Sequence, residues 1–134
     1  GSFGQYPGTD SKGADMFVAM ALGASLNNPA EAFGGSDAFA PESYDAAALI
    51  MLAMQAAGST DSAAVKDHLM AVANAPGEQI MPGELGKALD MIKAGKEIDY
   101  VGATAVELIG PGESAGNYRE IEIKDGAVAT VAFR

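Results

Sequence analysis

Apolar residues recur with the spacing of an α-helix in four stretches of this chain, and they alternate with polar residues only near its C-terminus. The helical stretches are 12–23, 42–57, 62–74 and 84–94. A residue that suits a helix end stands close to each of them, such as Thr60 or Asp61 before the third stretch. The first part of the chain is therefore predicted to be mainly helical.

The most apolar of these stretches is 42–57, which carries Ala, Leu, Ile or Met on nearly every helical face. Pro41 and Ser43 suit the first turn of a helix, and Gly58 suits its end. A helix that is apolar all round must be buried on several sides or cross a membrane, and a crossing needs about 20 apolar residues. We therefore expect a central helix with neighbours on more than one side.

Strands are predicted after residue 97, with an extended run at 101–109 and two strands at 118–124 and 127–133. Residues 1–9 are expected to form a loop, and 25–40 to form turns and an irregular connection. Helices followed by a terminal β-hairpin define an α+β fold class.

Two registers are possible for the hairpin around Asp125-Gly126. A two-residue Asp-Gly loop would place Ile121 opposite Thr130, whereas a three-residue loop over 124–126 gathers the apolar side chains on one face. That face would hold Ile121, Ile123, Ala127, Ala129, Val131 and Phe133. The three-residue loop is predicted, because a slip by one residue would remove this set from the buried side.

Charge and composition narrow the possible partners. The chain has 134 residues and a formal net charge of −10 at pH 7, which disfavours binding to nucleic acids and to anionic membranes. It has no cysteine, so disulfides and thiolate chemistry are excluded. No charged segment followed by an apolar segment opens the sequence, so we expect no signal peptide within it.

Residues for catalysis or metal binding are sparse. The single histidine, His68, flanks an apolar helical stripe, and its neighbour Asp67 points elsewhere. Glu120 and Glu122 are expected on the solvated face of a strand, and Asp125-Gly126 lacks the alternating oxygen ligands of a calcium loop. We therefore predict no enzymatic activity, no cofactor and no metal site.

Phe39 is the one candidate ligand-binding residue. It precedes the central helix between the small residues Ala38 and Ala40. An aromatic residue there commonly acts as a hydrophobic staple, but it can also form a wall of an apolar ligand pocket. Spacing alone favours the staple and leaves both interpretations open.

Four stretches of the sequence carry a resemblance to a known family. They are 38–49 (AFAPESYDAAAL), 57–61 (AGSTD), 89–103 (LDMIKAGKEIDYVGA) and 118–126 (YREIEIKDG). Because these stretches occur in the same order as in that family, the chain resembles the C-terminal part of the periplasmic binding proteins for branched-chain amino acids. These are substrate-binding components of ABC importers with a two-lobed α/β fold of the periplasmic-binding-protein-like I type.

The resemblance implies that the chain is a fragment of a two-lobed protein. Residues 1–97 would form the helical part of the first lobe. Residues 98–134 would form the crossover between the lobes, at 98–107, and then the terminal strands of the second lobe. Phe39 falls on a family position that contacts the ligand's side chain. The groups that hold the ligand's carboxylate and amine would lie in a missing N-terminal portion. The chain alone is then expected to bind amino acids very weakly or not at all.

Two functions from different classes follow. In the first, the chain is part of a periplasmic solute-binding protein that delivers branched-chain or related amino acids to the membrane subunits of an ABC importer. In the second, it is a stand-alone structural or interaction module that does not bind amino acids. Self-association into a homo-oligomer is expected for the chain by itself, because the central helix and the hairpin expose apolar surface.

Overall fold

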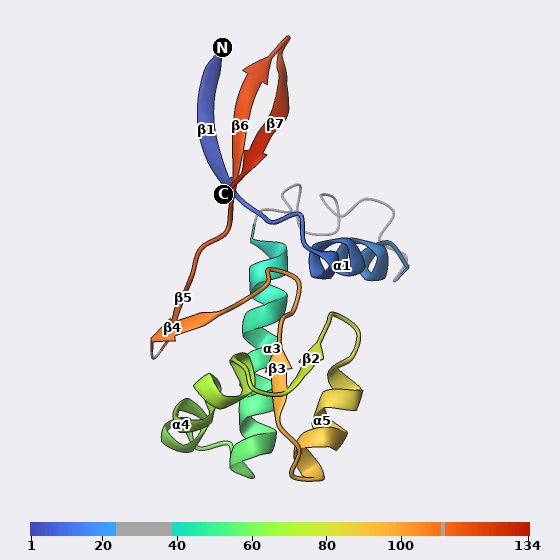
Figure 1. Cartoon of the computed structure of the whole chain (residues 1–134), viewed down its shortest axis with the longest axis vertical. Helices are drawn as coiled ribbons and strands as arrows, with labels where there is room; N and C mark the ends of the chain where they lie inside the picture. The colour runs from blue at the N-terminus through green and yellow to red at the C-terminus, as the bar shows by residue number, and fades with distance from the viewer. Residues whose placement is uncertain (24–38, 111) are drawn as a thin grey trace.

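The computed structural model of the chain describes residues 1–23, 39–110 and 112–134, and they form a mixed α+β fold, as predicted (Figure 1). The helices are α1 (Lys12–Gly23), α3 (Ala40–Ala57), α4 (Ser62–Ala73) and α5 (Leu85–Lys93). The strands are β1 (Ser2–Pro7), β2 (Glu78–Ile80), β3 (Ile98–Tyr100), β4 (Leu108–Gly110), β5 (Glu113–Ser114), β6 (Tyr118–Lys124) and β7 (Ala127–Phe133). The predicted helices are confirmed within two residues at each end, whereas the turns predicted at 25–40 lie mostly outside the described residues.

Helix α3 is the centre of a helical body in which α4 and α5 pack against it and the strands β2 and β3 run beside it (Figure 1). Ala48, Leu52 and Ala53 are completely buried, which confirms the predicted central position. Ile50 and Met51 are exposed, so the helix is not covered on all sides. No described helix is both long enough and apolar enough to cross a membrane.

The N-terminus of α3 differs from the prediction. Phe39 is the N-cap residue, Pro41 lies in the first turn, and the Ser43 hydroxyl donates to the Phe39 carbonyl at 2.8 Å rather than capping the helix. Gly58 ends the helix as predicted, with φ 60° and its N–H directed to preceding carbonyls. In α4, the Asp61 carboxylate accepts hydrogen bonds from the backbone N–H groups of Ala63 and Ala64, which confirms a predicted N-cap.

The strands of the helical body were mostly missed. β2 was not expected, and it pairs in parallel with β3, which begins three residues before the predicted extended run. Residues 102–105 form a turn, so the continuous extension predicted at 101–109 is wrong. Three-residue strands carry too little alternation to be recognised from the sequence.

A buried carboxylate fixes this turn to the central helix. Asp45 of α3, only 2% exposed, accepts from the Tyr100 hydroxyl and from the backbone N–H of Ala103 and of Thr104, each at 2.8 Å. It also accepts from the Thr104 hydroxyl at 2.7 Å. Burial, and then the adjacent Asp45 charge, raise the pKa of Tyr100 far above its usual range. Tyr100 therefore remains a neutral hydrogen-bond donor to Asp45.

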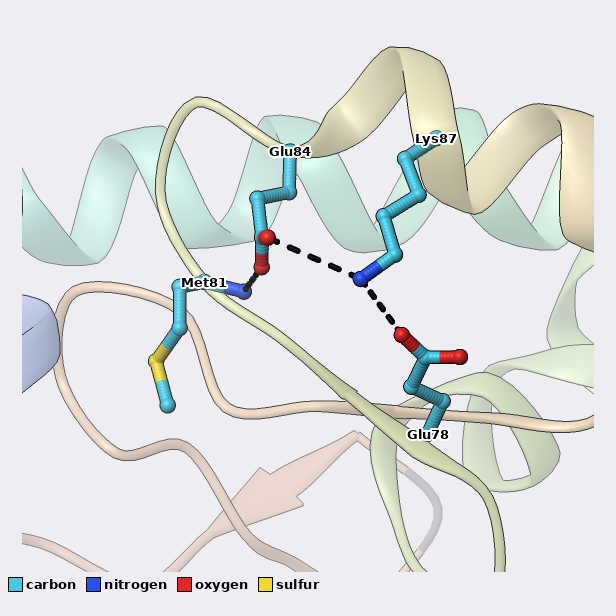
Figure 2. A network of polar contacts seen from close by, with 4 residues as sticks. All are labelled: Glu78, Met81, Glu84 and Lys87. Carbon is cyan, nitrogen blue, oxygen red and sulfur yellow. Dashed lines mark hydrogen bonds and ion pairs between the residues drawn. The ribbon is translucent and has the colours of Figure 1, made fainter.

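A smaller polar network joins β2 to the start of α5 (Figure 2). Lys87 forms ion pairs with Glu78 and Glu84, and the second oxygen of Glu84 accepts from the Met81 N–H at 2.9 Å. The hydrogen bond from Lys87 lowers the pKa of Glu78. All three charged groups are solvent-accessible, so the ion pairs contribute little to stability.

A separate antiparallel sheet, in the order β1-β6-β7, stands at one end of the molecule (Figure 1). The loop predicted at 1–9 is wrong for residues 2–7, because β1 pairs with β6 along its whole length. Two segments connect the sheet to the helical body, one after β1 and one before β6 (Figure 1). The assignment of 1–97 and 98–134 to two lobes stays a prediction.

The hairpin adopts the register that was not predicted. Ile121 lies opposite Thr130 and Lys124 opposite Ala127, so the loop has two residues, Asp125 and Gly126. Both loop residues have positive φ, 53° and 78°, as a type I′ turn requires, and Asp tolerates this conformation. The prediction failed because it assumed one buried face, whereas both faces of β7 are largely exposed.

The exposed sheet supports the prediction that the chain self-associates. Phe3, Val128 and Val131 are exposed apolar residues, and β1 and β7 are edge strands. We expect the average mass from light scattering to rise with concentration and to rise less in Val128→Lys. The matched control is Ile109→Lys, an exposed position on β4 away from this sheet. A constant monomer mass over the whole concentration series would contradict the prediction.

Candidate functional site

A cavity of about 400 Å³ lies between the helical body and the terminal sheet. Its walls come from α1, the start of α3, the turn after β3, the two connecting segments and all three strands of the sheet. The volume falls within the range of small-molecule binding sites, and aromatic side chains contribute much of the wall. The lining aromatic residues are Tyr6, Phe17, Phe39, Tyr118 and Phe133.

Phe39 lines this cavity from the start of α3. Its backbone has φ 62°, a left-handed conformation that is uncommon for a residue with a large side chain. The residue is 58% exposed, more than expected for a staple buried against the helix. The position fits a ligand-contacting wall, and the ligand contact itself stays a prediction.

Glu42, in the first turn of α3, also lines the cavity. A carboxylate in the first turn of a helix interacts favourably with the helix dipole. Its Oε2 atom, however, is buried and has no hydrogen-bond partner in the described part of the chain. Buried polar atoms are normally paired, so this oxygen is an exception, and because it is buried it does not form part of the accessible surface of the cavity.

Arg119 contributes the opposite charge from β6. Its guanidinium carbon lies 4.6 Å from the centre of the Tyr6 ring, a cation–π contact that positions the group. The Nε atom is buried and has no hydrogen-bond partner among the described residues. Like Oε2 of Glu42, this atom is buried and does not form part of the accessible surface of the cavity.

Asn117 ties together the segments that form the floor of the cavity. The side-chain NH2 group of Asn117 donates to the backbone carbonyl of Thr104 at 2.9 Å. The backbone carbonyl of Asn117 accepts from the Gly8 N–H at 3.1 Å. Gly8 and Asn117 belong to the two connecting segments, and Thr104 to the turn held by Asp45. The position of the sheet relative to α3 is thus set by hydrogen bonds next to the cavity.

The other sequence candidates lie elsewhere. His68 is half-buried on α4 with its Nδ1 2.8 Å from the Ala64 carbonyl oxygen, as expected for a histidine at the edge of a packed face. Glu120 forms an exposed ion pair with Arg134 on the sheet. Within residues 1–23, 39–110 and 112–134, no group of three or more acidic or histidine side chains converges on a metal site.

Glu42 and Arg119 were missed as site residues. Both belong to stretches that carry the family resemblance, but no spacing rule brings two residues so far apart in the chain into one cavity. The groups that bind the ligand's charged ends were expected outside this chain.

The chain is similar to a substrate-binding protein, the chemotactic signal transduction system substrate-binding protein BasB of Halobacterium salinarum. The two sequences are 36% identical over 93 residues, which make up 69% of this chain and 22% of the relative. The chain thus spans about a fifth of that relative's length. No protein-family model matches the chain, and no solved structure matches it.

Proposed function

We propose that the chain is part of a solute-binding protein that binds branched-chain or related amino acids in the cavity beside Phe39. The protein would deliver them to the membrane subunits of an ABC importer, act in the periplasm and have no enzymatic activity. The similarity to a substrate-binding protein supports binding of a small ligand. The observation that carries the proposal is an aromatic-walled cavity at the start of α3.

The alternative is an interaction module that does not bind amino acids. The exposed apolar sheet favours this function, because large exposed apolar patches commonly mark protein interfaces. The two functions differ in what the cavity does, so binding at the cavity separates them.

Phe39→Ala tests the proposed function directly. Truncating the ring removes apolar contact with the ligand, so we expect the affinity of the full-length protein for leucine, measured by calorimetry, to fall about tenfold. The melting temperature should change little, because the side chain is mostly exposed. Phe3→Ala is the matched control, since Phe3 is an exposed aromatic residue on β1 and does not line the cavity.

The same pair of measurements can contradict the proposal. A much lower melting temperature in Phe39→Ala together with unchanged affinity would mean that the ring acts as a staple. Equal loss of affinity in Phe3→Ala and Phe39→Ala would place binding away from the cavity.

A further inference from the structure

The two faces of the terminal sheet differ in charge. Residues directly opposite one another in an antiparallel sheet point to the same side, so the strand register assigns each side chain to a face. The face that carries the two isoleucines of β6 holds no charged side chain over most of its length. We call this part the uncharged face, and it consists of Ser2, Gly4, Ile121, Ile123, Val128 and Thr130.

The opposite face carries the charges, because Glu120, Glu122 and Lys124 alternate with the isoleucines along β6. Such alternation is typical of a sheet with one solvated side and one covered side. Ile123 and Val128 are nevertheless exposed. Within the described residues, no helix packs closely against these strands, and the sheet stands apart from the helical body (Figure 1). The uncharged face therefore has no cover in the described part of the chain.

The uncharged face is also separate from the cavity. The strands contribute Tyr6, Arg119 and Phe133 to the cavity wall, whereas none of the residues of the uncharged face lines it. What covers this face is therefore a question about a second surface, and the answer does not depend on ligand binding in the cavity.

Charge favours a second copy of the chain as the cover. The chain has a formal net charge of −10, so two copies repel each other wherever their carboxylates meet. The uncharged face carries no carboxylate, and Glu120 and Glu122 point to the other side of the sheet. Two copies that pack through their uncharged faces keep these carboxylates on the outside of the pair.

The shape of the uncharged face is complementary to itself. Ser2 and Gly4 make the β1 side low, whereas Ile123 and Val128 make the β6 and β7 side high. A Cβ at Gly4 would meet only the Ile121 side chain, at 3.7 Å, so the space above β1 is open. A two-fold axis that runs parallel to the strands above β6, the central strand, sets the low side of each copy against the high side of the other. The same contact then forms twice, as two-fold symmetry requires.

Self-association by itself does not fix which surfaces meet. We propose that the uncharged face binds the uncharged face of a second copy, about a two-fold axis above β6. Six residues along β1 and three strands give a patch of about 20 Å by about 14 Å. Patches of this size are typical of weak, transient complexes. The dimer is therefore reversible and is populated at high protein concentration.

Gly4→Leu tests the shape of the contact, with the dissociation constant of the dimer measured by sedimentation equilibrium. The new side chain fills the low side, so the dimer should be about tenfold weaker although the chain has become more apolar. Gln5→Leu is the matched control, because it adds the same side chain to the other face of β1 and should leave the dimer unchanged. The melting temperature of Gly4→Leu should not fall, since the space at Gly4 is open.

Val128→Lys tests the need for an uncharged face. It places an unpaired charge inside the contact, so the dimer should be about tenfold weaker or more. Ala127→Lys makes the same change of charge at the adjacent exposed residue, which points to the other face, and should not weaken the dimer. Added NaCl should strengthen the wild-type dimer, because it screens the repulsion between two acidic chains.

Each of four results would overturn the proposal. A monomer at every concentration shows that the uncharged face binds no second copy. Tighter association in Gly4→Leu indicates general apolar adhesion without a two-fold fit. Equal weakening by Val128→Lys and Ala127→Lys, or a wild-type dimer that salt dissociates, places the contact on a charged surface. None of these results bears on leucine binding in the cavity, so the proposed function is tested separately.

Discussion

Asp45→Ala is expected to destabilise the chain more than any other single substitution on α3. The change leaves the Tyr100 hydroxyl and the backbone N–H groups of Ala103 and Thr104 buried or half-buried without an acceptor. Each lost partner costs about 1–3 kcal/mol, and a small domain has only about 5–15 kcal/mol of stability. We expect the circular dichroism of the variant to show little cooperative unfolding.

Two controls identify the source of this effect. Tyr100→Phe removes one of the four hydrogen bonds and should cost about 1–2 kcal/mol. Asp90→Ala removes an exposed aspartate from α5 and should change stability by less than about 0.5 kcal/mol. If Asp45→Ala melted like Asp90→Ala, the carboxylate would not be what fixes the turn to α3.

Gly102→Ala is expected to be nearly as damaging, for a steric reason. Gly102 has φ 61°, and a Cβ there would lie 2.3 Å from Oδ1 of Asp45 and 2.6 Å from the Tyr100 ring. Both neighbours are held in place by their mutual hydrogen bond. The turn must therefore move. We expect the free energy of unfolding, measured by chemical denaturation, to fall by about 3 kcal/mol or more, which is comparable to the effect of overpacking a core.

Gly58→Ala is the matched control, because Gly58 has almost the same φ, 60°, and open space where a Cβ would be placed. Only the strain of the left-handed conformation applies there, about 1 kcal/mol. The difference between the two variants measures the crowding around Asp45. Equal losses of stability in the two variants would show that backbone strain alone accounts for the effect of Gly102→Ala.

The helices could be predicted because their determinants are local. Asp61 caps α4, Gly58 ends α3, and the apolar periodicity of α5 is complete within nine residues. These features act over a single turn or face, so they are visible in any short stretch of sequence. The expected bounds accordingly agree with the observed bounds within two residues.

The strands depend on partners that are distant in the sequence. β1 is ordered by pairing with β6, more than a hundred residues away, and no alternation of its own marks it as a strand. The hairpin register follows the turn geometry of Asp125-Gly126 rather than the burial of one face. The Asp-Gly pair is a local signal that favours the observed register, whereas no local pattern marks β1 as a strand.

The residues of the candidate site also differ in whether the sequence alone could identify them. Phe39 could be singled out because it stands next to the start of a helix, which is a local feature. Glu42 and Arg119 become candidates only when α3 and β6 are placed around one cavity. Their most informative property, a buried atom without a partner, exists only in the folded chain.

The stretches that carry the family resemblance have two physical roles. Asp45 from 38–49 meets Tyr100 and Ala103 from 89–103 in the buried hydrogen-bond cluster, so these residues hold the fold. Phe39 and Glu42 from the first stretch, and Arg119 from 118–126, line the cavity. The same short motifs thus fix the turn to α3 and supply residues that line the cavity.

A crystal structure of the full-length protein grown in saturating leucine tests the central claim, that the cavity beside Phe39 binds an amino acid. The expected result is leucine in the cavity, with its side chain against Phe39. A cavity that holds only solvent under these conditions, or leucine bound at another surface, would contradict it.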